Sequence, residues 1–147
     1  MSGWSRPPHF LCEALQWSEP WGLAIDGTSQ VLVGHVIVAA DSRTRRLGLL
    51  GRDALDGNSG LLLAPCQGIH TFGMRFPIDV VCVAHDGTTL KVVEAVGPSR
   101  VVMAWRAFAV VELSAGACRV AGLAVGDLVR PFTGAAAPAC RPGITVL

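Results

Sequence analysis

Prolines and glycines interrupt the most distinctive stretch of the chain, residues 60–83, and limit how it can fold. The stretch reads GLLLAPCQGIHTFGMRFPIDVVCV. Pro65 and Pro77 have no backbone N–H to donate, and each of the two glycines between them weakens a helix by about 1 kcal/mol. These residues therefore disfavour a continuous helix. We predict an extended segment that connects two buried strands, residues 61–63 and residues 78–83.

The segment between these two strands is rich in side chains that can bind or react. Read as extended chain with a period of two, it places His70, Phe72, Met74 and Phe76 on one side. The candidate ligand-binding residues have polar, charged or sulfur-containing side chains: Cys66, His70, Thr71, Met74, Arg75 and Asp79. An imidazole, a hydroxyl, a soft apolar group and opposite charges are the mixture expected of an apolar cleft with a few orienting polar groups.

Aliphatic residues surround Asp79 in the sequence, which predicts a buried carboxylate. An ionised carboxylate left unpaired in an apolar interior costs on the order of several kcal/mol. Asp79 is therefore expected to accept hydrogen bonds from backbone N–H groups, or to pair with Arg75, Arg106 or His70.

The run CQGIHTFGMRFPIDVVCVAHDG resembles the signature of domain-of-unknown-function family 192, a bacterial and archaeal family. That signature is a His or Trp, a Met followed by a basic residue, and Pro-Ile/Leu-Asp leading through an apolar strand into a hairpin. The residues that fit it are His70, Met74, Arg75, Pro77, Ile78 and Asp79. Three further blocks are similar to the family, namely TRRLGLLGR, VVELSAGACRVAGL and VGDLV. The resemblance covers roughly residues 30–130 and implies a compact, mainly β domain, without implying a reaction.

Length and composition predict one domain and argue against nucleic acid as a partner. A chain of 147 residues buries about two-thirds of its unfolded surface. We predict a domain over residues 30–132, an N-terminal extension at residues 1–29 and a peripheral tail at residues 133–147. The formal net charge of +1 argues against nucleic acid as a partner. A hydrophobic share of 51% favours a homo-oligomer.

The sequence lacks the apolar segments that membrane insertion or export requires. No run approaches the ~18 apolar residues of a membrane-spanning helix, so we predict no membrane span. Prolines and glutamates interrupt the first 21 residues, where a signal peptide needs an uninterrupted apolar segment. We therefore predict a cytoplasmic protein, although the family that it resembles includes exported members.

The cysteines predict neither a disulfide framework nor a metal site. The chain has an odd number of them: Cys12, Cys66, Cys82, Cys118 and Cys140. Their number and spacing predict reduced thiols. The pairs Cys66-x3-His70 and Cys82-x2-His85 have spacings that zinc sites tolerate. However, Cys82 lies inside an apolar strand, where a free cysteine is usually a small hydrophobic residue. No phosphate-binding or dinucleotide motif is present, so no metal and no cofactor are expected.

Many short apolar runs separated by turn residues predict a mainly β fold, either a compact β-sandwich or a partly closed barrel, with two short helices. The helices are predicted at residues 41–50 and at residues 117–121, the second capped by Ser114 and ended by Gly122. The sequence HDGT at residues 85–88 predicts a tight hairpin turn, since Asp-Gly readily supplies positive φ angles.

Three functions fit this sequence. The first is a binding module that contacts a small ligand or a protein partner through the surface from His70 to Asp79. The second is a hydrolase-type enzyme with Cys66 as nucleophile, His70 as base and Asp79 as the orienting carboxylate, although no nucleophile-elbow motif accompanies them. The third is a purely structural polar cluster in a protein that interacts through another face.

Overall fold

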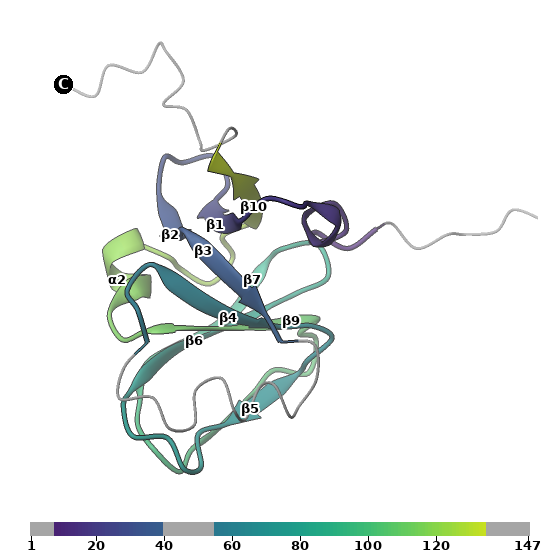
Figure 1. The fold of residues 1–147 in the computed structure, drawn as a ribbon. Coiled ribbons are helices and arrows are strands. Elements are labelled where there is room, and N and C mark those ends of the chain that lie inside the picture. The colour runs from purple at the N-terminus through teal and green to yellow at the C-terminus, as the bar shows by residue number, and fades with distance from the viewer. Residues whose placement is uncertain (1–7, 40–54, 135–147) are drawn as a thin grey trace, which may run out of the picture.

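The computed structural model describes residues 8–39 and 55–134, which are mainly β strands (Figure 1). The described strands, in chain order, are β1 (Trp21–Ile25), β2 (Val31–Val33), β3 (His35–Val38), β4 (Ser59–Leu63), β5 (Gly68–His70), β6 (Ile78–Val83), β7 (Thr89–Val96), β8 (Val101–Met103), β9 (Ala109–Ser114) and β10 (Val129–Thr133). A turn of 3-10 helix, η1 (Ala14–Gln16), precedes them, and a short α-helix, α2 (Ala117–Ala121), follows β9. The predicted mainly β fold is confirmed.

These strands form open sheets. The largest has the order β3-β4-β9-β6-β7, a second has the order β10-β1-β2, and β5 pairs with β8 in a two-stranded ribbon. Strands β3 and β4 run parallel, while the other strand pairs of the described residues are antiparallel. Residues 21–25, which the sequence assigns to an N-terminal extension, form β1 at the centre of the three-stranded sheet.

The five-stranded sheet is covered on both faces, which explains why every residue of β6 is buried. Val81 and Val83 pack on one side with residues of β1, β2 and α2. Val80 and Cys82 pack on the other side with residues of β5 and β8. Alternate side chains of β6 thus pack into two separate cores, and the β5–β8 ribbon forms the outer layer of one of them.

The predicted hairpin turn joins β6 to β7. The Ala84 N–H donates to the Thr88 carbonyl at 2.8 Å, and Gly87 has a φ of 96°. The Thr88 N–H also donates to the Asp86 carboxylate at 2.9 Å. This hydrogen bond lowers the pKa of Asp86 from its ordinary value.

Helix α2 has the predicted bounds and ends at the predicted glycine, Gly122, which has a φ of 70°. The predicted cap at Ser114 is wrong. Gly116 stands at the N-cap position with a φ of 94° and has no capping side chain of its own. A carboxylate from a distant strand replaces the local cap, as described below. The predicted helix at residues 41–50 lies outside the described residues. Among the residues that the structure does describe, no helix is long and apolar enough to cross a membrane.

Candidate functional site

The β5–β8 ribbon divides its side chains between the core and solvent. Ile69 lies opposite Val102, and both are buried against the five-stranded sheet. His70 lies opposite Val101, and both are exposed on the outer face. Because successive strand residues point to opposite faces, Met103 shares that outer face with Val101. The ribbon thus buries one pair of residues and presents the next pair to solvent.

An exposed apolar strip follows the outer face of this ribbon. Val101 is 61% exposed and Met103 is 58% exposed. At one end, the ring of Phe72 lies 5.2 Å from the imidazole of His70. At the other end, Trp105 is 90% exposed, and Gln67 anchors its backbone by donating to the Trp105 carbonyl at 2.9 Å. We define the ribbon surface by its members: His70, Phe72, Val101, Met103 and Trp105.

Positive charge flanks the ribbon surface. Arg75, Arg100 and Arg106 are exposed and lie in the segments that contain the strip. The Lys91 ammonium donates to the Met103 carbonyl at 2.8 Å, so a fourth cation lies against the ribbon. Residues 65–78 and 97–108 contain no aspartate or glutamate. The two segments that form the ribbon surface therefore carry only positive formal charge, although the whole chain is close to neutral.

Thr71 holds the ribbon in place from beneath. This buried residue donates through its hydroxyl to the Gly97 carbonyl at 2.7 Å, and the hydroxyl accepts from the Arg100 N–H at 2.9 Å. The Thr71 backbone N–H also donates to the Arg100 carbonyl at 2.9 Å. Both hydrogen-bonding roles of the hydroxyl are used by the turn that leads into β8. Thr71 therefore fixes the position of β8 relative to the end of β5.

Asp79 is fully buried, and its carboxylate bonds to backbone N–H groups. One oxygen accepts from the Ala95 N–H at 2.9 Å. The other accepts from the Gly116 N–H at 3.1 Å and from the Cys118 N–H at 3.0 Å. Of the two arrangements expected from the sequence, backbone hydrogen bonds or a pair with a cationic side chain, the structure has the first. The carboxylate caps α2 from a neighbouring strand, which supplies partners for N–H groups that a helix start leaves free.

A bulge in β7 brings Ala95 to this carboxylate. Ile78 pairs with Val96 and Val80 pairs with Val93, so β7 has one more residue than β6 across this interval. Ala95 has a φ of 51°, in a region that non-glycine residues seldom adopt. The hydrogen bond to Asp79 stabilises that conformation, as is common at bulges and other strained positions.

The remaining predicted site residues lie in different surroundings. Met74 is buried in the core beneath the ribbon, and Arg75 is exposed. The half-buried Cys66 thiol donates to the Gly68 carbonyl at 3.1 Å. The expected alternation holds for His70 and Phe72 and then ends. The Met74 N–H donates to the Thr71 carbonyl, and this turn directs Met74 into the core.

The predicted site residues therefore separate into a support and a surface. Thr71, Met74 and Asp79 are buried and hold the backbone or fill the core. His70 and Arg75 are exposed to solvent. The three side chains of the alternative hydrolase triad have different contacts. The Cys66 thiol donates to the Gly68 carbonyl, the His70 imidazole contacts the Phe72 ring, and the Asp79 carboxylate accepts from backbone N–H groups.

Burial governs the two core thiols. Burial raises the pKa of Cys82, and a smaller opposing effect comes from Lys91. Burial, together with the neighbouring Asp79 carboxylate, raises the pKa of Cys118 to about 12. Both thiols therefore stay protonated at neutral pH and act as small apolar groups. Within residues 8–39 and 55–134, no group of three or more His, Cys, Asp or Glu side chains is arranged to hold a metal ion.

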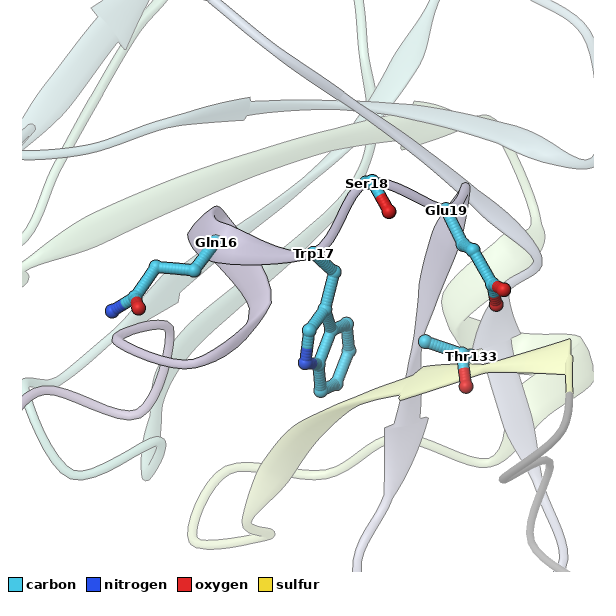
Figure 2. A pocket seen from close by; sticks show the side chains of 5 residues that line it. All are labelled: Gln16, Trp17, Ser18, Glu19 and Thr133. Carbon is cyan, nitrogen blue, oxygen red and sulfur yellow. The ribbon is translucent and has the colours of Figure 1, made fainter.

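Two open hollows lie away from the ribbon surface. Figure 2 shows the first, in which the Trp17 indole points toward β10; its volume is about 410 Å³ and its lining is Gln16, Trp17, Ser18, Glu19 and Thr133. The second has a volume of about 500 Å³ and is lined by residues of the β1–β2 turn, α2 and the segment before β10. Neither lining includes a predicted site residue.

Val101, Met103 and Trp105, three of the five residues of the ribbon surface, were not among the predicted site residues. They alternate with less exposed residues in the run VVMAW. This alternation was the available signal, although the strand itself ends at Met103 and Trp105 lies in the turn that follows. The pairing of this strand with His70, some thirty residues away in the chain, had no local sequence signal.

Two solved structures share this fold. One is a protein of unknown function from Novosphingobium aromaticivorans DSM 12444, with a TM-score of 0.63 and 22% identity over 76% of this chain and 83% of that chain. The other, from Sinorhizobium meliloti 1021, is described as a proposed transcription regulator, with a TM-score of 0.62 and 22% identity over 77% of this chain and 92% of that chain. At this identity the likeness concerns the fold alone.

Sequence comparison identifies a family. A search of curated proteins found no match to this chain. The model of the family DUF192, described as "Uncharacterized ACR", matches residues 23–131. That range runs from β1 to β10 and includes the ribbon, the Asp79 carboxylate and α2. The chain therefore belongs to the DUF192 family.

Proposed function

We propose that this protein is a binding module whose contact surface is the ribbon surface. The observation that carries the proposal is the exposed apolar strip, in which Phe72, Val101, Met103 and Trp105 are each more than half exposed. The largest apolar patch on a monomeric protein, typically about 300–600 Å², is often the place at which it contacts a partner or a ligand. A tryptophan that is 90% exposed leaves a large apolar ring in water.

The buried polar residues support this surface. Thr71 fixes the turn that begins β8, and Asp79 fixes the bulge that precedes that turn. We therefore assign the predicted polar cluster two roles. Its buried members position the backbone, and His70 and Arg75 contribute to contact. This division is also consistent with the separate contacts of the three side chains of the alternative hydrolase triad.

Oxidative footprinting inside the cell tests whether the ribbon surface is occupied. Hydroxyl radicals modify exposed tryptophan and methionine side chains readily, so Met103 and Trp105 report on the strip directly. We expect both residues to be modified several-fold less in intact cells than in the purified protein. Trp17, which is partly buried beside η1, is the internal control and should show the same extent of modification in both samples.

The outcome that would overturn the proposal is equal modification of Met103 and Trp105 in the two samples, because the strip would then be open to solvent in the cell. A fall of the same size at Trp17 would also count against it, since that result would show general protection of the whole molecule. A substitution offers a second check. Val101→Ser should leave the fold intact, because Val101 is exposed, and should weaken the protection at Trp105.

A further inference from the structure

The shape and charge of the ribbon surface indicate what binds to it. We propose that the ribbon surface docks onto an anionic phospholipid surface, with Phe72 and Trp105 entering the interfacial layer and the flanking cations facing the headgroups. This inference rests on the proposed function, because it names the occupant of the same surface.

The apolar area of the strip does not decide between a protein and a lipid surface. With two aromatic rings, a valine and a methionine at the exposures given above, the strip presents roughly 500 Å² of apolar surface. This is close to the apolar part of the ~800 Å² that each partner buries in a protein–protein interface, so the choice rests on shape and charge. A membrane requires no matching shape, because lipid molecules rearrange around whatever inserts. A few protruding side chains are therefore enough for reversible binding.

The position of the strip also suits a planar target. The ribbon forms the outer layer of the domain, at the opposite end of the molecule from β10 and η1 (Figure 1). Small-molecule sites are concave and enclose most of their ligand, whereas Trp105 is 90% exposed at the end of the ribbon. Indole rings favour the boundary between water and hydrocarbon, because they combine a large apolar ring with an N–H donor.

The two segments that contain the strip carry charge of one sign. Arg100, Arg106 and Lys91 flank the strip, and these segments have no carboxylate. Anionic headgroups offer negative charge across the whole membrane plane, so each exposed cation can find a partner in any rotational orientation. Exposed cations beside aromatic side chains are also the composition of membrane-surface binding segments.

Vesicle sedimentation with the full chain tests the proposal. The probes are vesicles of phosphatidylcholine alone and vesicles in which about a third of the lipid is phosphatidylglycerol. We expect binding to the anionic vesicles and several-fold weaker binding to the neutral ones. Raising the ionic strength from about 0.05 M to about 0.5 M should weaken the anionic binding strongly, since screening shortens the range of the attraction.

Two variants and two matched controls locate the contact. Trp105→Ala should lower the partition coefficient roughly tenfold, because it removes the largest inserting side chain. Arg106→Gln should lower it roughly fivefold, the value of one cation near an anionic surface. The control Val120→Ala removes an 86% exposed side chain from α2, and the control Arg119→Gln makes the same change in net charge on that helix. Both controls should change binding less than about twofold.

The outcomes distinguish the proposed occupant from its competitors. Loss of binding in Trp105→Ala and Arg106→Gln, with both controls unaffected, supports a lipid surface. Equal losses in the controls overturn it, because binding would then not depend on the ribbon surface in particular. Displacement from anionic vesicles by glycerol phosphate, beyond that caused by a chloride salt of equal ionic strength, overturns it in favour of a free anion. Protection of Met103 and Trp105 in cells without any vesicle binding overturns the lipid proposal alone and assigns the surface to a protein partner.

Discussion

Replacing Asp79 tests whether one carboxylate holds three elements together. Its two oxygens accept hydrogen bonds from the Ala95, Gly116 and Cys118 N–H groups at 2.9, 3.1 and 3.0 Å. In Asp79→Asn one oxygen becomes an NH2 donor, so at least one of the three N–H groups then faces another donor. In Asp79→Ala all three N–H groups lose their partner.

The magnitude follows from burial. A buried polar group without a partner costs about 1–3 kcal/mol. Ala95 is exposed and Gly116 is half-buried, so water can reach their N–H groups, whereas Cys118 is buried. We expect Asp79→Asn to lower the free energy of unfolding by about 1–3 kcal/mol, with the remaining oxygen kept toward α2. Asp79→Ala should lower it by about 3–5 kcal/mol, as three charge-assisted hydrogen bonds are lost.

Urea denaturation measures this loss, provided that the slope with denaturant stays unchanged. Asp127→Asn is the matched control, because the Asp127 carboxylate accepts one exposed hydrogen bond, from the Ala124 N–H at 2.9 Å. It should cost less than about 1 kcal/mol. Equal midpoints for the Asp79→Asn and Asp127→Asn variants would refute the reasoning, since the three-donor arrangement would then add nothing to an ordinary surface carboxylate.

Three further predictions concern pH, the ribbon support and sheet packing. Folding raises the pKa of Cys118 from 9.0 to about 12, so the thiol ionises at lower pH in the unfolded chain. The thermal midpoint should therefore fall as pH rises from about 9 to about 12. The midpoint of the Cys118→Ala variant should fall less over the same range. Thr71→Val removes a hydroxyl that both donates and accepts, and we expect a loss of about 1–3 kcal/mol in urea titrations, with a loss below about 0.5 kcal/mol counting against a supporting role. Gly22→Ala would place a Cβ against the Val33 carbonyl, whereas a Cβ at Gly57 meets open space; the first substitution should lower the thermal midpoint and the second should change it little.

Local patterns predicted the mainly β fold and the buried strands at residues 61–63 and 78–83, because burial on both faces leaves a continuous apolar run. β6 and β9 are apolar along nearly their whole length and lie at the centre of the large sheet. The turn at residues 85–88 was also predicted, since Asp-Gly specifies its geometry within four residues. These features depend on neighbours in the sequence, which a single chain displays directly.

Features that depend on distant partners were not readable in the same way. The cap of α2 comes from Asp79, 37 residues before Gly116. The residues next to the helix predict Ser114 as the cap instead. The burial of Met74, by contrast, depends on a local turn from Thr71, in which Gly73 has a φ of 82°; that glycine was the available signal. The candidate residues were grouped by proximity in sequence, whereas the fold sorts them by whether their side chains face the core or solvent.

The separate hydrogen bonding of the β5–β8 ribbon has a dynamic consequence. A two-stranded sheet is marginally stable alone, so this ribbon depends on the packing of Ile69 and Val102 against the larger sheet. We expect the ribbon to open locally while the ladder of β6 and β9 stays closed. Its amide hydrogens should therefore exchange with solvent through smaller, more frequent openings than those of β6 and β9. A partner bound to the outer face of the ribbon should slow these openings before those of the larger sheet. The hydrogen-exchange rate of the Val102 amide would therefore report whether the ribbon surface is bound.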